Sequence, residues 1–132
     1  MPMDKVLISL TTISTRVNNV HEVIDSILSQ EVDGLFNFEV KLYLSNEQYM
    51  LDEGVTALPH ELEKRLSDER FEVEFVENIG SYRKYLYAMK DHLSGKRPVD
   101  FLVTCDDDTL YPAWWLKTLY EKVSTYFIFY TH

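Results

Sequence analysis

The chain has 132 residues, of which 45% are hydrophobic and 14% aromatic, enough for one folded domain and too many for a disordered protein. Thirteen basic residues against 22 acidic ones give a net charge of −9, which argues against a nucleic-acid partner because phosphate backbones require a basic face. The single cysteine, Cys105, excludes an internal disulfide and fits a reducing compartment.

The first half of the chain predicts two strands with a helix between them. Lys5 to Leu10 is apolar and rich in β-branched residues, which is typical of a buried first strand. A polar turn follows, and Asn19 is the expected N-cap of a helix that ends near Gln30. Glu39 to Ser45 alternates apolar and polar side chains, which predicts the second strand.

The middle of the chain predicts a helix, a strand and a third helix. Pro59 suits the first turn of a helix, and Phe71 to Val76 alternates apolar with acidic residues, as an edge strand with one wet face does. Gly80 supplies backbone freedom in the next turn, and Ser81 is the expected cap of the third helix. The apolar stripe of this helix is expected to face the core, and it comprises Tyr82, Tyr85, Leu86, Met89 and Leu93.

An apolar run from Phe101 to Cys105 ends abruptly in three carboxylates, Asp106, Asp107 and Asp108. Such a run predicts a fully buried strand, and a last helix is expected to begin at Pro112. Three adjacent acids repel one another, so a divalent cation, basic side chains or helix amide dipoles should balance them. The alternative is a solvated acidic loop whose last aspartate caps the helix.

The alternation of strands and helices predicts an α/β, Rossmann-like domain with three layers, α/β/α, and a mostly parallel sheet. The first and fourth strands are the most apolar and are expected to be central, with the third at an edge. The predicted strand order is 3-2-1-4, and the topological switch point then lies between strands 1 and 4. Ligands of such sheets bind beyond the carboxyl ends of the strands at this point.

The predicted crevice brings two polar segments together. Thr11, Thr12 and Arg16 follow strand 1 and should face Asp106 to Asp108, which follow strand 4. We expect Asp106 and Asp108 to converge on one side of the crevice, facing Thr11 or Thr12, and Asp107 to point elsewhere or toward the start of the last helix.

Carboxylate oxygens select hard cations, so a site for Mg²⁺, Mn²⁺ or Ca²⁺ is predicted at the acidic triplet. Such an ion usually completes its shell with water and substrate phosphates, and a nucleoside diphosphate fits this requirement. Arg16, Arg83 and Lys84 are the basic candidates to assist. For Arg83 and Lys84, the alternative is an exposed helical face.

Three segments together resemble a bacterial glycosyltransferase of the GT-A fold, of a family 2-like type with an Asp-x-Asp element. They are Val6-Leu7-Ile8-Ser9-Leu10-Thr11-Thr12 followed by Arg16, then Asn78-Ile79-Gly80-Ser81-Tyr82-Arg83-Lys84, then Thr104-Cys105-Asp106-Asp107-Asp108-Thr109-Leu110-Tyr111-Pro112-Ala113-Trp114-Trp115-Leu116. The resemblance implies that Asp106 and Asp108 are the two acids that hold a nucleotide-sugar diphosphate through a divalent metal. The nucleotide-sugar-binding residues expected are Thr11, Thr12, Arg16, Arg83, Lys84, Asp106 and Asp107.

The resemblance also implies a reaction, the transfer of sugar from a nucleotide-diphosphate donor to a carbohydrate or glycolipid acceptor. It leaves the sugar, the base, the acceptor and the catalytic residues unassigned. No apolar run is long enough to span a bilayer, so the expected location is the cytoplasm, with peripheral association at the inner face of the membrane as a further expectation.

Two other functions stay open. A magnesium-dependent phosphatase with an aspartyl nucleophile carries Asp-x-Asp-x-Thr/Val after a buried strand, but here Leu110 stands at the last position and the motif follows the fourth strand instead of the first. A non-catalytic nucleotide-binding module would bind the nucleotide without transferring anything.

We expect residues 1–132 to form a single domain that is incomplete at its C-terminus. In the family resembled, the general base and the acceptor site lie well beyond the Asp-x-Asp element, whereas 24 residues follow Asp108 here. The segment Tyr126 to His132 is apolar and aromatic, like a strand without neighbours, and would invite self-association. The expectation is nucleotide binding without transfer, and self-association or a missing C-terminal half.

Overall fold

The structure is a computed structural model that describes residues 3–127. In the tail that was predicted to resemble a strand, Tyr126 and Phe127 instead belong to the last helix, and residues 128–132 lie outside the described residues. Four strands alternate with helices. In chain order the elements are β1 (Lys5–Thr11), α1 (Val20–Leu28), β2 (Asn37–Leu44), α2 (His60–Arg65), β3 (Phe71–Phe75), the short 3-10 helix η1 (Gly80–Tyr82), α3 (Arg83–Leu93), β4 (Phe101–Thr104) and α4 (Trp115–Phe127).

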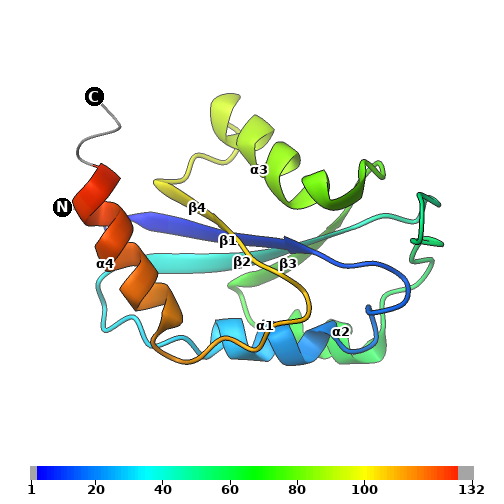
Figure 1. Cartoon of the computed structure of the whole chain (residues 1–132), viewed down its shortest axis with the longest axis horizontal. Helices are drawn as coiled ribbons and strands as arrows, with labels where there is room; N and C mark the ends of the chain where they lie inside the picture. The colour runs from blue at the N-terminus through cyan, green and yellow to red at the C-terminus, as the bar shows by residue number, and fades with distance from the viewer. Residues whose placement is uncertain (1–2, 128–132) are drawn as a thin grey trace.

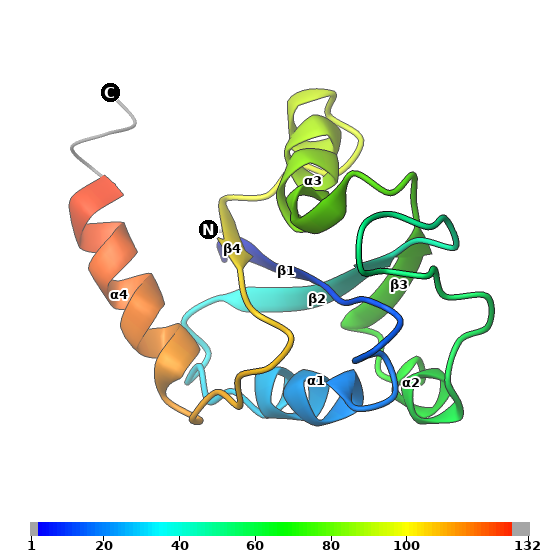
Figure 2. The same ribbon diagram turned by 45° about the vertical axis from the view of Figure 1, so that its right-hand side comes forward.

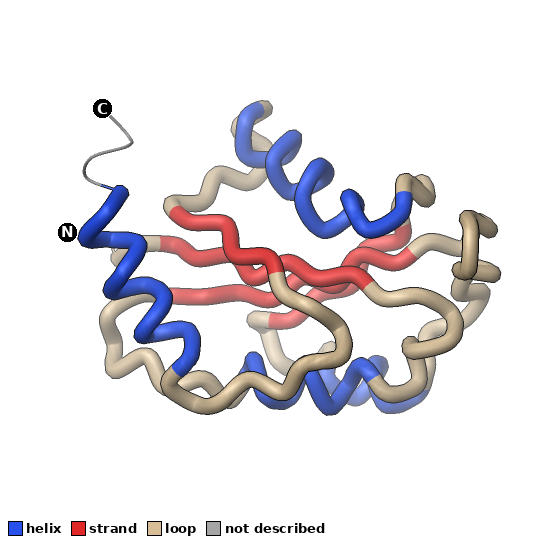
Figure 3. The backbone as a smooth tube through the Cα atoms, in the orientation of Figure 1, coloured by secondary structure: helices blue, strands red, loops and turns tan. Residues whose placement is uncertain are grey.

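The strands form one parallel sheet in the order β3-β2-β1-β4, which confirms the predicted order. Helices α1 and α2 cover one face of the sheet, and α3 lies alone over the other (Figures 1 and 3). Helix α4 stands beside the β4 side of the sheet (Figure 2). The fold is therefore Rossmann-like, with β3 at one edge as its alternating sequence predicted.

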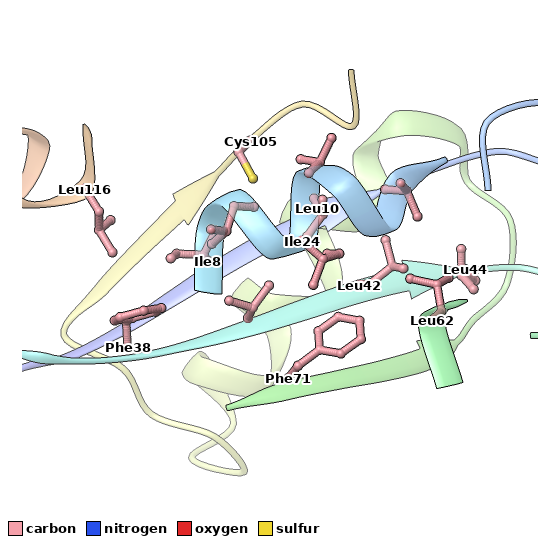
Figure 4. Close-up of a cluster of buried hydrophobic side chains, with 14 of the residues drawn as sticks. Ile8, Leu10, Ile24, Phe38, Leu42, Leu44, Leu62, Phe71, Cys105 and Leu116 are labelled. Atoms are coloured by element: carbon pink, nitrogen blue, oxygen red, sulfur yellow. The ribbon is translucent and has the colours of Figure 1, made fainter. Parts of the chain in front are cut away.

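The two faces of the sheet differ strongly in polarity. The face toward α1 and α2 carries a large apolar core, built from residues such as Ile8, Leu42, Ile24 and Phe71 (Figure 4). On the face toward α3, the buried apolar cluster consists of Leu7, Tyr43 and Ala88, with a few partly buried neighbours. The hydrophobic effect therefore holds the α1 and α2 layer much more strongly than the α3 layer.

Helix α3 packs in the opposite orientation to the one predicted. Its buried residues are Arg83 and Ala88. Tyr82, Leu86 and Leu93 of the predicted stripe are exposed, and Tyr85 and Met89 line a groove between α3, β4 and α4. The reason lies in the strands beneath it, which present mostly polar side chains to this helix. They include Ser9 and Thr11 of β1, Glu39 and Lys41 of β2, and Glu72 and Glu74 of β3, where Lys41 and Arg97 form ion pairs with the acids.

Strand β4 is neither central nor fully buried, contrary to expectation. It pairs only with β1 among the described residues, and Phe101, Leu102 and Val103 are half-buried while Thr104 is exposed. Its apolar composition reflects contact with the core on one face and with the α3 layer on the other. Its outer edge has no strand partner within residues 3–127.

Three predicted helix ends differ from the structure. Asn19 has helical backbone angles, and within the described residues its side chain caps nothing, because turns over residues 13–19 already lead into α1. Ser81 lies inside η1, so it does not cap α3. Helix α4 begins at Trp115 instead of Pro112. No helix in the described part of the chain is long and apolar enough to cross a membrane.

Candidate functional site

The loops that follow β1, β2 and β4, and the turn before α3, meet at the carboxyl edge of the sheet. The most direct link across this edge joins Thr12 to Asp107, 95 residues apart, with 2.6 Å between Thr12 Oγ1 and Asp107 Oδ2. The contact bridges the ends of β1 and β4. The predicted meeting of these two segments is therefore confirmed for Thr12, and also for Arg16, whose Nε donates to Asp107 Oδ2 at 2.7 Å.

Asp107 is the acid of the triplet that points inward, so the prediction that it points elsewhere is wrong. Its side chain is only 9% exposed, whereas Arg16, its ionic partner, is half exposed. The hydrogen bond to Asp107 raises the pKa of Arg16. Asp107 lies in the turn that follows β4, and its hydrogen bonds to Thr12 and Arg16 hold it in this orientation.

Asp106 and Asp108 are both exposed to solvent. Lys84 Nζ lies 3.4 Å from Asp106 Oδ1 and also donates to the carbonyl oxygen of Cys105. The Asp106 N–H donates to the Tyr111 hydroxyl at 2.9 Å, and this bond fixes the backbone of the triplet. Two carboxylates thus remain accessible to a ligand, while the third is held by the protein itself.

The positions of the three carboxylates determine what kind of cation site they could form. No group of three or more His, Cys, Asp or Glu side chains that could hold a metal ion occurs among residues 3–127. Asp106 and Asp108 offer carboxylate oxygens, which suit Mg²⁺ or Mn²⁺, ions that commonly take one or two protein carboxylates plus substrate phosphates and water. The donor set therefore fits an ion that arrives with an anionic ligand and does not fit a closed protein cage.

A cleft of about 230 Å³ lies next to the triplet, between the loops after β1 and β2 and the turn before α3. Thr12 and Arg16 line it while also holding Asp107, so the cleft and the acids share a wall. Its lining combines apolar, aromatic and hydrogen-bonding side chains. The lining residues are Thr11, Thr12, Ile13, Arg16, Tyr49, Met50, Leu51, Asp52, Asn78, Gly80, Ser81 and Arg83.

Asp52 links the loops that line this cleft, and sequence reasoning missed it because it lies in an irregular connection. It is buried, and its carboxylate accepts from the N–H groups of Ser14 and Gly54, from Asn78 Nδ2 and from Arg83 Nη1, at 2.9–3.3 Å. Burial alone would raise the pKa of Asp52, but the hydrogen bonds and the guanidinium outweigh it and the pKa lies below its usual range. Only the Asp52-Glu53-Gly54 turn composition hinted at local structure here.

Arg83 is the cationic partner of Asp52 and lies almost wholly inside the protein, at 1% exposure. Its Nη2 donates to the carbonyl oxygen of Thr12 at 2.9 Å, whereas its Nε has no acceptor among the described residues. Burial lowers its pKa. The alternative of an exposed helical face is therefore wrong for Arg83, and Lys84 is also turned toward the crevice.

Thr11 is placed differently from its neighbour. Its Oγ1 donates to the carbonyl oxygen of Tyr43 at 2.7 Å, so the side chain binds the end of β2 and does not face the acids. Thr11 still lines the cleft.

Gly80 lines the cleft and has a left-handed backbone conformation, which glycine adopts more readily than other residues. Its φ is +74°, and an added Cβ would lie 3.1 Å from Tyr49 Cε1. We expect G80A to lose more free energy of unfolding than the about 1–2 kcal/mol of left-handed backbone strain. G95A is the matched control, since Gly95 has φ +79° and open space around its Cβ position. Urea unfolding measures both, and equal losses would show that Tyr49 does not constrain Gly80.

The fold and the site define a class of protein, a Rossmann-like α/β domain with an acidic crevice at its topological switch point. No known family model matches this chain, and no curated protein sequence matches it either.

Proposed function

We propose that the crevice binds a nucleotide-diphosphate sugar and that the protein is a metal-dependent glycosyltransferase, or the donor-binding part of one. The observation that carries this proposal is the contact of Thr12 and Arg16 with Asp107, which turns that acid inward and leaves Asp106 and Asp108 exposed at the switch point. The similarity of the three sequence segments to GT-A glycosyltransferases supports the same function.

In this proposal each part of the site has a role. Asp106 and Asp108 hold Mn²⁺ or Mg²⁺, which would supply positive charge to the diphosphate. Arg16 is half exposed at the boundary between the acids and the cleft, where its guanidinium can reach an anionic ligand. The cleft, with the Tyr49 ring at its wall, suits the flat base and the ribose of the nucleotide. The acceptor is a carbohydrate or a glycolipid, reached in the cytoplasm or at the inner face of the membrane.

Calorimetry with uridine and guanosine diphosphates, with Mn²⁺ and with chelator, tests the binding step. We expect one of the two nucleotides to bind in a Mn²⁺-dependent manner, because exposed carboxylates and a polyphosphate can share a hard cation. Incubation with a panel of nucleotide sugars then tests turnover. Binding without turnover would favour the nucleotide-binding module. Release of phosphate from a phosphate monoester, without nucleotide binding, would favour the phosphatase and contradict the proposal.

A further inference from the structure

The outer side of α3 carries large apolar side chains that the sequence pattern predicted to be buried against the sheet. Tyr82, at the start of the helix, is 67% exposed, and Tyr85, Leu86 and Leu93 are 47%, 47% and 76% exposed. Together with Met89 they recur at helical spacing on the side opposite Arg83 and Ala88. We call these five residues the α3 stripe. Tyr85 and Met89 line a groove between α3, β4 and α4, whereas Tyr82, Leu86 and Leu93 lie outside that groove.

A rotation of α3 about its axis would not bury the α3 stripe favourably against the sheet. Turning the stripe inward would place it over Ser9, Lys41 and the acids of β2 and β3, and would expose the buried Arg83 and its partner Asp52. The present orientation satisfies those polar groups. The exposed stripe is therefore a stable feature of the fold, and a set of large apolar side chains of this kind marks an interaction surface.

The charge around α3 differs from that of the rest of the chain. Five of the 13 Lys and Arg residues lie in the 16 residues from 82 to 97, together with only one of the 22 acids, Asp91. Arg83 and Arg97 are paired inside the structure, but Lys90 and Lys96 are exposed, and no described carboxylate pairs with them. A local excess of lysine beside an apolar stripe is the pattern of a helix that lies at a membrane surface.

We propose that the α3 stripe docks the protein on an anionic lipid surface. Leu86 and Leu93 enter the boundary between headgroups and acyl chains, and Tyr82 and Tyr85 keep their hydroxyl groups at the headgroup level. Lys90 and Lys96 attract the anionic lipids. The chain carries a net charge of −9, so other faces are repelled by such a surface and α3 is the side that meets it.

The proposed lipid docking does not depend on the proposed nucleotide site, but the two together suggest where the acceptor is found. Lys84 on α3 reaches Asp106, so a docked α3 holds the crevice close to the membrane surface. An acceptor that is a glycolipid would be presented there. Failure of nucleotide binding would leave the lipid docking intact, and failure of lipid docking would leave the nucleotide site intact.

Co-sedimentation with phosphatidylcholine vesicles, with and without phosphatidylglycerol, tests the proposal on the full chain. The parent should bind vesicles that contain phosphatidylglycerol and bind phosphatidylcholine alone more weakly. L86S/L93S should lower the partition coefficient at least about tenfold, since two leucines lose their apolar burial. K90E/K96E should remove the preference for phosphatidylglycerol. The control L35S/L66S changes two exposed leucines outside the α3 stripe and should bind like the parent.

Thermal unfolding shows whether the variants keep the parent fold, as expected from their exposed positions. Light scattering measures whether a second copy covers the stripe instead. A parent protein that binds neither kind of vesicle overturns the proposal. So does an L86S/L93S variant that binds lipid as the parent does, or one that turns a stable dimer into a monomer without changing lipid binding.

Discussion

Replacing Asp106 and Asp108 together by asparagine is expected to remove Mn²⁺-dependent nucleotide binding and to leave the fold unchanged. Both side chains are exposed, and neither belongs to the contact that closes the crevice, which Asp107 makes with Thr12 and Arg16. Asparagine keeps the size of the side chain and removes the charge that a hard cation requires. Removal of a group that supports a metal ligand typically lowers metal affinity about 10- to 100-fold. Removal of the two ligands themselves should lower the affinity for Mn²⁺ and the nucleotide by at least this factor.

Calorimetry with Mn²⁺ and the diphosphate that the parent binds, together with a thermal melt, measures this effect. D107N is the comparison variant, since it removes one charge from the same triplet, where D106N/D108N removes two. Asp107 accepts from Thr12 and Arg16, so D107N should lower the melting temperature and displace the crevice loops. Because Arg16 is half exposed, the ion pair itself contributes no more than about 1 kcal/mol. If D106N/D108N binds the nucleotide and Mn²⁺ as tightly as the parent, the proposed metal site is wrong.

D52A is expected to destabilise the protein by about 3–5 kcal/mol, the range observed when one partner of a buried ion pair is removed. The Asp52 carboxylate is the only anionic group within hydrogen-bond distance of Arg83 among the described residues. Its removal leaves the guanidinium buried beside unpaired N–H groups of Ser14 and Gly54. Three loops that line the cleft lose their shared acceptor, so nucleotide binding should fall as well.

Urea unfolding at neutral pH measures the loss, and D25N provides the control. Asp25 pairs with Arg65 on the surface, where the side chain of Asp25 is half exposed, so this change should be worth less than about 1 kcal/mol. Equal losses in the two variants would mean that the Asp52 network does not hold the fold.

The pH dependence of the free energy of unfolding also tests whether the Asp52 carboxylate stabilises the fold. The pKa of Asp52 is lower in the folded protein than in the unfolded chain, so its contribution is complete above the unfolded value of about 4 and disappears as the pH falls through the folded value. The pKa values of Asp25, Glu61 and Asp68 are also lowered and add to this acid loss. The stability difference between the parent and D52N should therefore shrink below pH 4.

The sheet could be predicted from the sequence because side chains along a strand alternate between its two faces, so the order of apolar and polar residues shows which face is buried. Val40 and Leu42 alternate with Lys41 and Tyr43, and in the structure the first pair enters the main core while the second faces α3. The acidic triplet was also recognisable, since an apolar run that ends in carboxylates marks the carboxyl end of a strand. The meeting of Thr12 with Asp107 then follows from the parallel order of β1 and β4.

The sequence by itself thus determined the elements, their order in the sheet and the edge of the sheet at which the acidic triplet lies. Only the tertiary structure decided which side of α3 is buried, because an apolar stripe predicts burial only where the facing sheet is apolar too, and here that face carries Ser9, Lys41 and Glu74. It also decided that Arg83 is internal. A buried arginine requires a carboxylate from elsewhere in the chain, and Asp52, 31 residues away in an irregular loop, becomes its partner only when the fold brings the two loops together.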